Sequence, residues 1–310
     1  QRLKCKVISV GNITLGGTGK TTLVEFIARY LKQQGHRVAI LSRGYKRLVQ
    51  SSRFKVQSYE TMGDEPYMLQ ENLQGVPVIV DKDRLRSAAR AIRDYSVDTV
   101  ILDDGFQQWR IKKDLEIITI DAVNPFGNRH LLPRGILRQG LSALRRPDVF
   151  ILTKTNLNPD IGQIKEALNE LNPHSLIVES VHEPLGFYNI NHPKEILSSG
   201  SLKGKSAALF SGIGDPESFE NLIARCGIHI GLSFRFRDHH NYTKQDLDKV
   251  IQSAREKNID TIITTAKDAA RLLGMADITG QLSILVLRIA LKVTKNEEGL
   301  FARLVSLYSC

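Results

Sequence analysis

The sequence predicts an α/β fold with a mostly parallel sheet, followed by a second, smaller α/β domain. Short apolar runs recur along the first part of the chain, and helical patterns separate them. Polar clusters follow several of these runs, at the place where parallel sheets bind their ligands. Near residues 182–204 the chain becomes rich in loop-forming residues, and a new set of strands and helices follows.

The first part of the chain is predicted to alternate strands and helices. Helical periodicity covers Lys20–Lys32, Arg84–Tyr95 and Ile161–Leu171. The expected strands are Lys6–Val10, Val38–Leu41, Val76–Val80, Thr99–Leu102, Glu116–Ile120 and Val149–Leu152. Because neighbouring strands are joined through helices, they are expected to pair in parallel.

The last part of the chain repeats this alternation on a smaller scale. We expect strands at Ser206–Phe210, near Ile228–Phe234 and at Thr261–Thr264, with helices at Pro216–Cys226 and Asp246–Lys257. The prediction is therefore a domain at 1–181, a linker at 182–204 and a smaller C-terminal domain at 205–310.

The composition favours a globular protein with an anionic partner. The chain has 310 residues, 42% hydrophobic and 25% charged residues, and a net charge of +10. It has no apolar run of about 18 residues that could span a membrane, and its three cysteines form no C-x-x-C pair. The stretch Arg129–Arg146 holds five arginines, one histidine and no acid, interleaved with leucines. This pattern favours contact with a membrane surface or an anionic amphiphile.

A phosphate-binding loop is the strongest single motif. Its residues are Gly16, Gly17, Thr18, Gly19, Lys20, Thr21 and Thr22. The loop follows a predicted strand and opens a predicted helix, which is the context that this motif requires. Lys20 is expected to reach the β- and γ-phosphates of a nucleotide, and the Thr21 hydroxyl to bind Mg²⁺. The first domain is thus predicted to be P-loop NTPase-like.

A pair of carboxylates is the second chemical element. Asp103 and Asp104 end the apolar run at 99–102. In nucleotide enzymes with such a loop, an acidic residue at the end of a neighbouring strand holds Mg²⁺. Thr21, Asp103 and Asp104 are therefore the predicted metal ligands.

Taken in order, these and further motifs resemble the tetraacyldisaccharide 4'-kinase family of lipid A biosynthesis. The matching motifs are Gly16–Thr21, Ser42–Arg47, Gly63–Pro66, Asp103–Gln107, Leu131–Arg138, Asp238-His239 and Thr265–Asp268. The set spans nearly the whole chain and is much more specific than the phosphate loop alone. Departures from the family pattern are Thr22, where many members have Pro, and Gln139, where many have Glu.

The resemblance implies an ATP- and Mg²⁺-dependent kinase that phosphorylates the 4'-hydroxyl of tetraacyldisaccharide 1-phosphate to give lipid IVA. It also implies peripheral attachment to the cytoplasmic face of the bacterial inner membrane, and no nucleic-acid partner is expected. Asp64 would accept the proton of the substrate hydroxyl, and His239 would assist it from the second domain. Lys20 and Arg138 would act on the transferred phosphate, and the substrate-binding residues would be Arg84, Asn124, Arg134 and Arg138.

Two alternatives come from other classes of P-loop protein. A partitioning-type ATPase that binds DNA or a membrane would also suit the loop and the positive charge, but its signature lysine is replaced by Leu15. A metallochaperone-type GTPase would need Thr153–Asn156 to be a guanine-reading motif, whose expected Asp is Asn156 here. Retention of the protein on DNA in a salt-sensitive manner would favour the first alternative.

Overall fold

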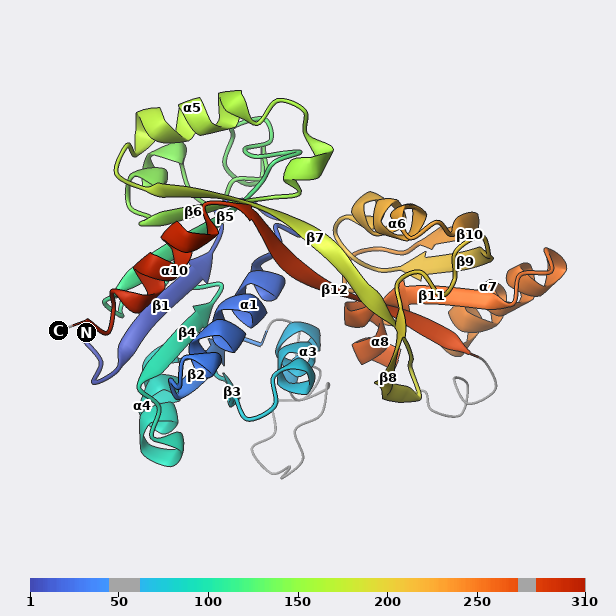
Figure 1. Cartoon of the computed structure of the whole chain (residues 1–310), viewed down its shortest axis with the longest axis horizontal. Helices are drawn as coiled ribbons and strands as arrows, with labels where there is room; N and C mark the ends of the chain where they lie inside the picture. Colours follow the sequence, from blue (N-terminus) through green and yellow to red (C-terminus); the bar gives the residue numbers. More distant parts are fainter. Residues whose placement is uncertain (45–61, 273–282, 310) are drawn as a thin grey trace. The chain divides into compact units, whose positions relative to one another are not determined.

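The computed structural model describes residues 1–44, 62–272 and 283–309 (Figure 1). These residues form two compact units. Unit 1 comprises residues 1–44, 69–182 and 291–309, and unit 2 comprises residues 62–68, 183–272 and 283–290. The chain starts in unit 1, contributes residues 62–68 to unit 2 and returns to unit 1 at residue 69. It enters unit 2 again at residue 183 and is back in unit 1 from residue 291.

Unit 1 is built on a parallel sheet. Its strands are β1 (Lys6–Gly11), β2 (Val38–Ser42), β3 (Val78–Val80), β4 (Thr99–Asp103), β5 (Leu115–Asp121), β6 (Val149–Thr153) and the first half of β7 (Leu176–Asn189). They lie in the order β7-β6-β5-β1-β4-β2-β3. The central strand β1 pairs with β4 on one side, where Val10 is in register with Asp103, and with β5 on the other. The carboxyl ends of β1 and β4 are therefore adjacent.

The helices of unit 1 are α1 (Lys20–Gln33), the end of α3 (Asp64–Asn72), α4 (Arg84–Tyr95), α5 (Gly162–Leu171) and α10 (Glu297–Val305), with the short 3-10 helices η1 (Leu141–Arg145) and η2 (Thr155–Leu157). Asp83 caps α4 by accepting the backbone N–H of Leu85 at 3.0 Å. On α10, the ring of Phe301 stacks on Tyr30 of α1 with centroids 4.0 Å apart. The end of the chain is thereby fixed to the helix that follows the glycine loop.

Unit 2 has a parallel sheet in the order β10-β9-β11-β12. Its elements are β8 (His192–Ser198), β9 (Ser206–Ser211), α6 (Pro216–Arg225), β10 (His229–Arg235), α7 (Lys244–Glu256), β11 (Thr261–Thr265), α8 (Ala266–Leu272) and the part of β12 (Ile284–Lys295) before residue 291. Strand β8 pairs antiparallel with the second half of β7.

Alternation along β9 gives unit 2 a core on each side of its sheet. Ala208 and Phe210 pack in a cluster with residues of α7 and α8. The intervening Leu209 packs in a second cluster with Phe219 and Ile223 of α6. Successive side chains of a strand point to opposite faces, so the two helical layers cover opposite faces of this sheet.

The predicted α/β class with parallel sheets is confirmed. Each strand and helix predicted between residues 6 and 171 and between 206 and 264 is present with closely similar bounds. The predicted linker at 182–204 is a correction, because much of it is strand, in β7 and β8. Pro184, Gly186 and the lack of buried residues in β8 conceal the strand pattern in the sequence.

A second correction concerns Asp64. The predicted first domain contained this residue, whereas the structure places it in unit 2 with His239.

Among the described residues, no helix has both the length and the apolar character needed to cross a membrane.

Candidate active site

The glycine loop of unit 1 lies between the end of β1 and the start of α1. Gly16 and Gly19 have positive φ values of 106° and 79°, which glycine adopts without strain. Gly19 is the N-cap of α1. Apart from its chain neighbours, no heavy atom of the described residues lies within 4 Å of a Cβ built on Gly16 or Gly17, so this part of the structure leaves the loop open on that side. An open glycine loop at a helix N-terminus has the form of a phosphate cradle.

Hydrogen bonds from three strand ends hold the loop in shape. Asn12 donates through Nδ2 to the carbonyl of Thr14 at 2.8 Å and to Oγ1 of Thr18 at 3.1 Å. The hydroxyls of Thr18 and Thr119 lie 2.8 Å apart, and Thr153 donates to the carbonyl of Thr18 at 3.2 Å. These groups are buried, so the loop is preorganised before any ligand binds.

The segment 131–138 lies against the glycine loop. The backbone N–H of Leu15 donates to the carbonyl of Ile136 at 2.8 Å, and that of Arg138 donates to the carbonyl of Ile13 at 2.6 Å. Thr14 and Leu137 form an isolated antiparallel bridge. Two motifs more than 100 positions apart in the sequence are thus joined, and Arg138 is placed beside the loop.

Arg138 forms a two-point ion pair with Asp104. Its two terminal nitrogens lie 2.7 and 2.8 Å from Oδ1 and Oδ2 of Asp104. Burial would raise the pKa of Asp104, but the bonds from Arg138 and the nearby charge of Lys20 outweigh it and lower this pKa. The pair therefore remains charged at neutral pH.

Asp103, by contrast, faces the interior. Its side chain is buried, and Oδ2 accepts a hydrogen bond from Ser42 at 3.1 Å. Arg84 is buried as well, and it donates to the backbone carbonyls of Asp81 at 3.1 Å and Asp103 at 2.9 Å. Arg84 thus supports the turn that carries the two carboxylates. Its predicted contact with substrate remains a prediction.

The donors at this end of unit 1 fit a magnesium ion that also binds nucleotide phosphates. Within the described part of the chain, no cluster of three His, Cys, Asp or Glu side chains could hold a metal by itself. Mg²⁺ in phosphoryl-transfer sites takes only one or two protein oxygens and completes its shell with phosphates and water. The Thr21 hydroxyl and the carboxylates of Asp103 and Asp104 supply oxygens of this kind.

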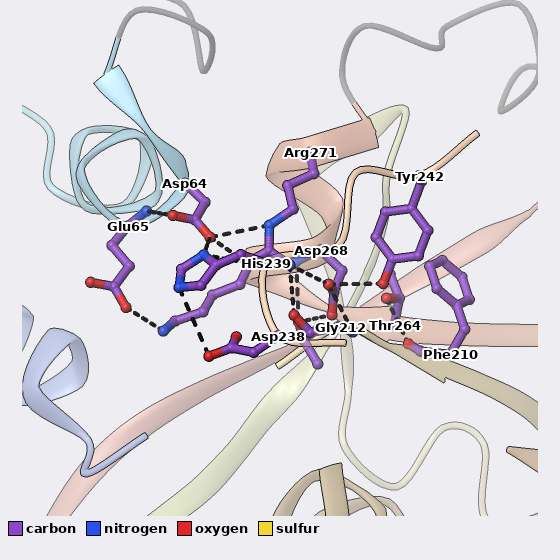
Figure 2. Close-up of polar contacts among 12 residues, drawn as sticks. Asp64, Glu65, Phe210, Gly212, Asp238, His239, Tyr242, Thr264, Asp268 and Arg271 are labelled. Atoms are coloured by element: carbon purple, nitrogen blue, oxygen red, sulfur yellow. Dashed lines mark hydrogen bonds and ion pairs between the residues drawn. The ribbon is translucent and has the colours of Figure 1, made fainter. Parts of the chain in front are cut away.

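A second polar cluster lies in unit 2 around Asp64 and His239 (Figure 2). Asp64 begins α3, and Nδ1 of His239 donates to its Oδ2 at 3.1 Å. His239 has a left-handed backbone with φ 59°, and its N–H donates to the carbonyl of Gly212 at 3.0 Å. The predicted partnership of these two side chains is therefore present as a direct contact within one unit.

Arg271 is the residue that the sequence did not reveal. Its guanidinium donates to Oδ2 of Asp64 from Nε at 3.1 Å and from a terminal nitrogen at closer range. Burial would raise the pKa of Asp64, but the bonds from His239 and Arg271 hold it well below its usual range. Asp64 is thus a carboxylate fixed by two partners.

The Thr265–Asp268 motif explains how α8 presents Arg271. The backbone N–H of Asp268 donates to Oγ1 of Thr265 at 3.2 Å, and Thr265 donates back to Oδ2 of Asp268 at 2.6 Å. This is a helix cap like a capping box. Arg271 lies three positions further along the same helix, so it faces the same side as Asp268.

Neighbouring residues in both motifs have different tasks. His240, next to His239, lies 3.0 Å from Oδ2 of Asp246 and stacks on Phe236, so it is part of the α7 cap and the core. Lys267 forms an ion pair with Glu65 beside Asp64. The sequence alone could not show which residue of the Lys267-Asp268 pair, or of the His239-His240 pair, faces the site.

Three further predicted site residues, Arg134, Asn124 and Thr22, lie in unit 1. Arg134 and Asn124 are exposed, and Oδ1 of Asn124 accepts the backbone N–H of Gly127 at 3.0 Å. Thr22 donates to the carbonyl of Gly19 at 2.8 Å and lies 3.0 Å from Nε2 of His182. Gln139 accepts a hydrogen bond from Arg146 at 3.2 Å.

Known proteins resemble the chain along its whole length. The sequence profile of the family described as "LpxK: Tetraacyldisaccharide-1-P 4'-kinase" matches residues 1–308. The tetraacyldisaccharide 4'-kinase of Halothermothrix orenii is 37% identical over 289 residues, which cover 87% of this chain and 74% of that protein. The enzyme of the same name from Elusimicrobium minutum is 37% identical over 310 residues, covering 96% and 81%.

A solved structure agrees with this sequence similarity. The crystal structure of LpxK from Aquifex aeolicus in complex with ATP aligns with a TM-score of 0.75 and 29% identity. The alignment covers 100% of this chain and 90% of that one.

Proposed function

The chain belongs to the tetraacyldisaccharide 4'-kinase family, and on this premise we propose that it transfers the γ-phosphoryl group of ATP to the 4'-hydroxyl of tetraacyldisaccharide 1-phosphate, giving lipid IVA. The observation that carries the proposal is the preorganised glycine loop with the Arg138–Asp104 pair beside it. An ATPase of the partitioning type is not favoured, since the family matches extend over the whole chain.

The nucleotide would bind in unit 1. The backbone around Gly16–Gly19 would surround its phosphates, with the Lys20 ammonium on the β- and γ-phosphates. The Thr21 hydroxyl and the Asp103 and Asp104 carboxylates would hold Mg²⁺, which neutralises charge on the transferred group when bound. Arg138 would keep Asp104 ionised and in place.

The acceptor hydroxyl would be activated in unit 2. As its oxygen bonds to the γ-phosphorus and the bond from phosphorus to the leaving ADP oxygen breaks, its proton passes to Asp64. His239 holds Oδ2 of this carboxylate through Nδ1. Phosphoryl transfer depends mainly on placement and charge neutralisation, so a carboxylate of low pKa suffices as the acceptor of the proton.

The substrate is a lipid, and the exposed leucines beside the loop suit it. Leu15, Leu131 and Leu132 are 50%, 51% and 46% exposed, and they lie on the two segments that the Thr14–Leu137 bridge joins. Arg129 and Arg134 are exposed on the same stretch. Leucines flanked by arginines favour the surface of an anionic membrane, here the cytoplasmic face of the bacterial inner membrane.

Transfer of labelled phosphate tests the proposal directly. The protein is incubated with γ-labelled ATP, Mg²⁺ and the tetraacyldisaccharide 1-phosphate in detergent micelles. We expect a labelled product with one additional phosphate at the 4'-position, and no product when the 4'-hydroxyl is blocked. Hydrolysis of ATP without labelled lipid would contradict the proposal.

A further inference from the structure

Resting on the proposed role of Asp64 as proton acceptor, we propose that Arg271 is a positioning residue for the reaction. It would hold Asp64 ionised and direct the free side of its carboxylate toward the acceptor hydroxyl. Figure 2 shows Arg271 of α8 and the neighbouring His239 both directed toward Asp64.

The two oxygens of Asp64 are used unequally. Oδ2 receives Nε and a terminal nitrogen of Arg271 together with Nδ1 of His239. Within the described residues, Oδ1 accepts the backbone N–H of Glu65 at 3.0 Å. A carboxylate oxygen has two lone pairs, so Oδ2 is filled and Oδ1 retains a lone pair for a hydroxyl. Arg271 thus selects which oxygen can accept the proton.

Arg271 is itself held by groups that do not belong to Asp64. Its Nη1 donates to the carbonyl of Gly212 at 2.7 Å and to Oδ1 of Asp268 at 2.9 Å. Asp268 is fixed in turn by the hydroxyl of Tyr242 at 2.9 Å and the N–H of Gly212 at 3.0 Å. The side chain of Arg271 is only 2% exposed. A buried guanidinium with several fixed partners has little freedom to move.

The same carbonyl links Arg271 to His239. Gly212 accepts Nη1 of Arg271 at 2.7 Å and the backbone N–H of His239 at 3.0 Å. The two partners of Asp64 are therefore placed by one peptide group. This geometry makes the position of the carboxylate a property of the whole cluster rather than of α3 alone.

The positive charge of Arg271 also affects the pKa of Asp64. The side chain of Asp64 is 7% exposed, and burial alone would favour its protonated form. The hydrogen bond from His239 and the charge and bonds of the adjacent guanidinium together reverse this preference and lower the pKa of Asp64. Without Arg271 the pKa of Asp64 should rise, so the acid limb of the turnover profile should move to higher pH. A residue with a merely structural role would not shift that limb.

The test measures turnover against pH for wild type, Arg271→Gln and Arg271→Lys at saturating ATP and lipid. We expect Arg271→Gln to move the acid limb up by about one to three pH units and to lower turnover at neutral pH by about 10²-fold. Arg271→Lys should recover part of the pH shift but not the two-point contact. Arg235→Gln, which removes an exposed two-point pair with Glu220 in the same unit, is the matched control and should behave as wild type.

Asp64→Asn and the double variant with Arg271→Gln separate the possible outcomes. If Arg271 acts through Asp64, the double variant should be little worse than Asp64→Asn alone. Losses that multiply, or an unchanged pH profile in both Arg271 variants, would overturn the positioning role. Wild-type activity in Asp64→Asn would instead refute the proposed base. Thermal melting of Arg271→Lys, the milder change, shows whether a folded protein was measured.

Discussion

Asp64 and His239 are 175 positions apart in the sequence, and their side chains meet with Oδ2 of Asp64 at 3.1 Å from Nδ1 of His239. Both residues belong to unit 2. The sequence predicted that they would lie in different domains. The contact is instead part of a single buried cluster, so we expect the two side chains to act together in the free protein as well.

This contact predicts strong non-additivity between the two residues. Asp64→Ala should lower turnover by about 10²- to 10⁴-fold, and His239→Ala by less, because the imidazole orients the carboxylate that takes the proton. The double variant should lose little beyond Asp64→Ala alone. Turnover of all four proteins at saturating lipid and ATP checks this, with ATP affinity as the control. If the two single losses multiply, His239 acts elsewhere than on Asp64.

The buried pair of Asp64 and Arg271 predicts how stability depends on pH. The folded-state pKa of Asp64 is lowered, so its contribution to stability is present above the unfolded value of about 3.9 and lost as the pH falls below it. Asp64→Asn leaves a buried guanidinium without its charge partner and should cost about 3–5 kcal/mol at neutral pH.

Urea unfolding of wild type and Asp64→Asn between pH 7 and about pH 3 measures this dependence. The gap in unfolding free energy should narrow as the pH falls. A gap that is constant over the whole range would mean that Asp64 is not ionised in the fold.

Local patterns allowed much of unit 1 to be predicted. Its strands are buried apolar runs and its helices are amphipathic, so periodicity is informative there. The glycine loop and the Asp103–Asp104 turn were predicted because their chemistry lies in adjacent residues. In β8 every residue is exposed, and no apolar alternation marks the strand. Strand β12 and helix α10 were not predicted, although both carry buried residues.

Arg271 could not have been predicted from local pattern, because its role depends on contacts between residues far apart in the sequence. Asp64 lies 207 positions before it. The one available signal was its spacing of three from Asp268, which on a helix indicates a shared face but no partner. Arg84 shows another limit of local pattern: the sequence did not indicate that this arginine is buried and donates to two backbone carbonyls.

The glycine loop predicts a large and selective loss of catalysis. Lys20→Ala and Thr21→Ala should each lower turnover by roughly three orders of magnitude or more, since they remove charge neutralisation at the transferred phosphate. Folding should be little affected in Lys20→Ala. Gln33→Ala, an exposed change at the end of the same helix, is the control. Near-normal ATP-dependent activity in either loop variant would contradict the assignment of the loop.

The exposed leucines predict a membrane-binding surface. Replacing Leu131 and Leu132 together by Ser should weaken flotation of the protein with anionic vesicles by roughly tenfold, because each leucine buries apolar area in the interface. Leu157→Ser, at another leucine of unit 1 that is 38% exposed, should have no such effect. Binding that is unchanged in the double variant and persists at high salt would place the membrane-binding surface elsewhere.

Arg138 and Arg134 lie on the same segment, and we expect substitutions at the two positions to impair the reaction in different ways. Arg138 holds Asp104 by two parallel bonds, so Arg138→Lys keeps the charge but loses this geometry. We expect turnover to fall by about 10²-fold in Arg138→Ala, with only partial recovery in Arg138→Lys. Arg134 is exposed, and its backbone carbonyl accepts a hydrogen bond from Nδ2 of Asn128 at 3.0 Å. Arg134→Ala should therefore mainly raise the KM for the lipid.

Initial rates with ATP and lipid varied separately resolve the two effects, and Arg145→Ala, an exposed change in the same basic stretch, is the control. Melting temperatures should differ little from wild type for Arg134→Ala, because surface substitutions are usually mild. Full recovery of turnover by Arg138→Lys would show that charge alone matters at this position. A large drop in melting temperature with normal kinetics in the folded fraction would assign Arg138 to the support of the loop rather than to the reaction.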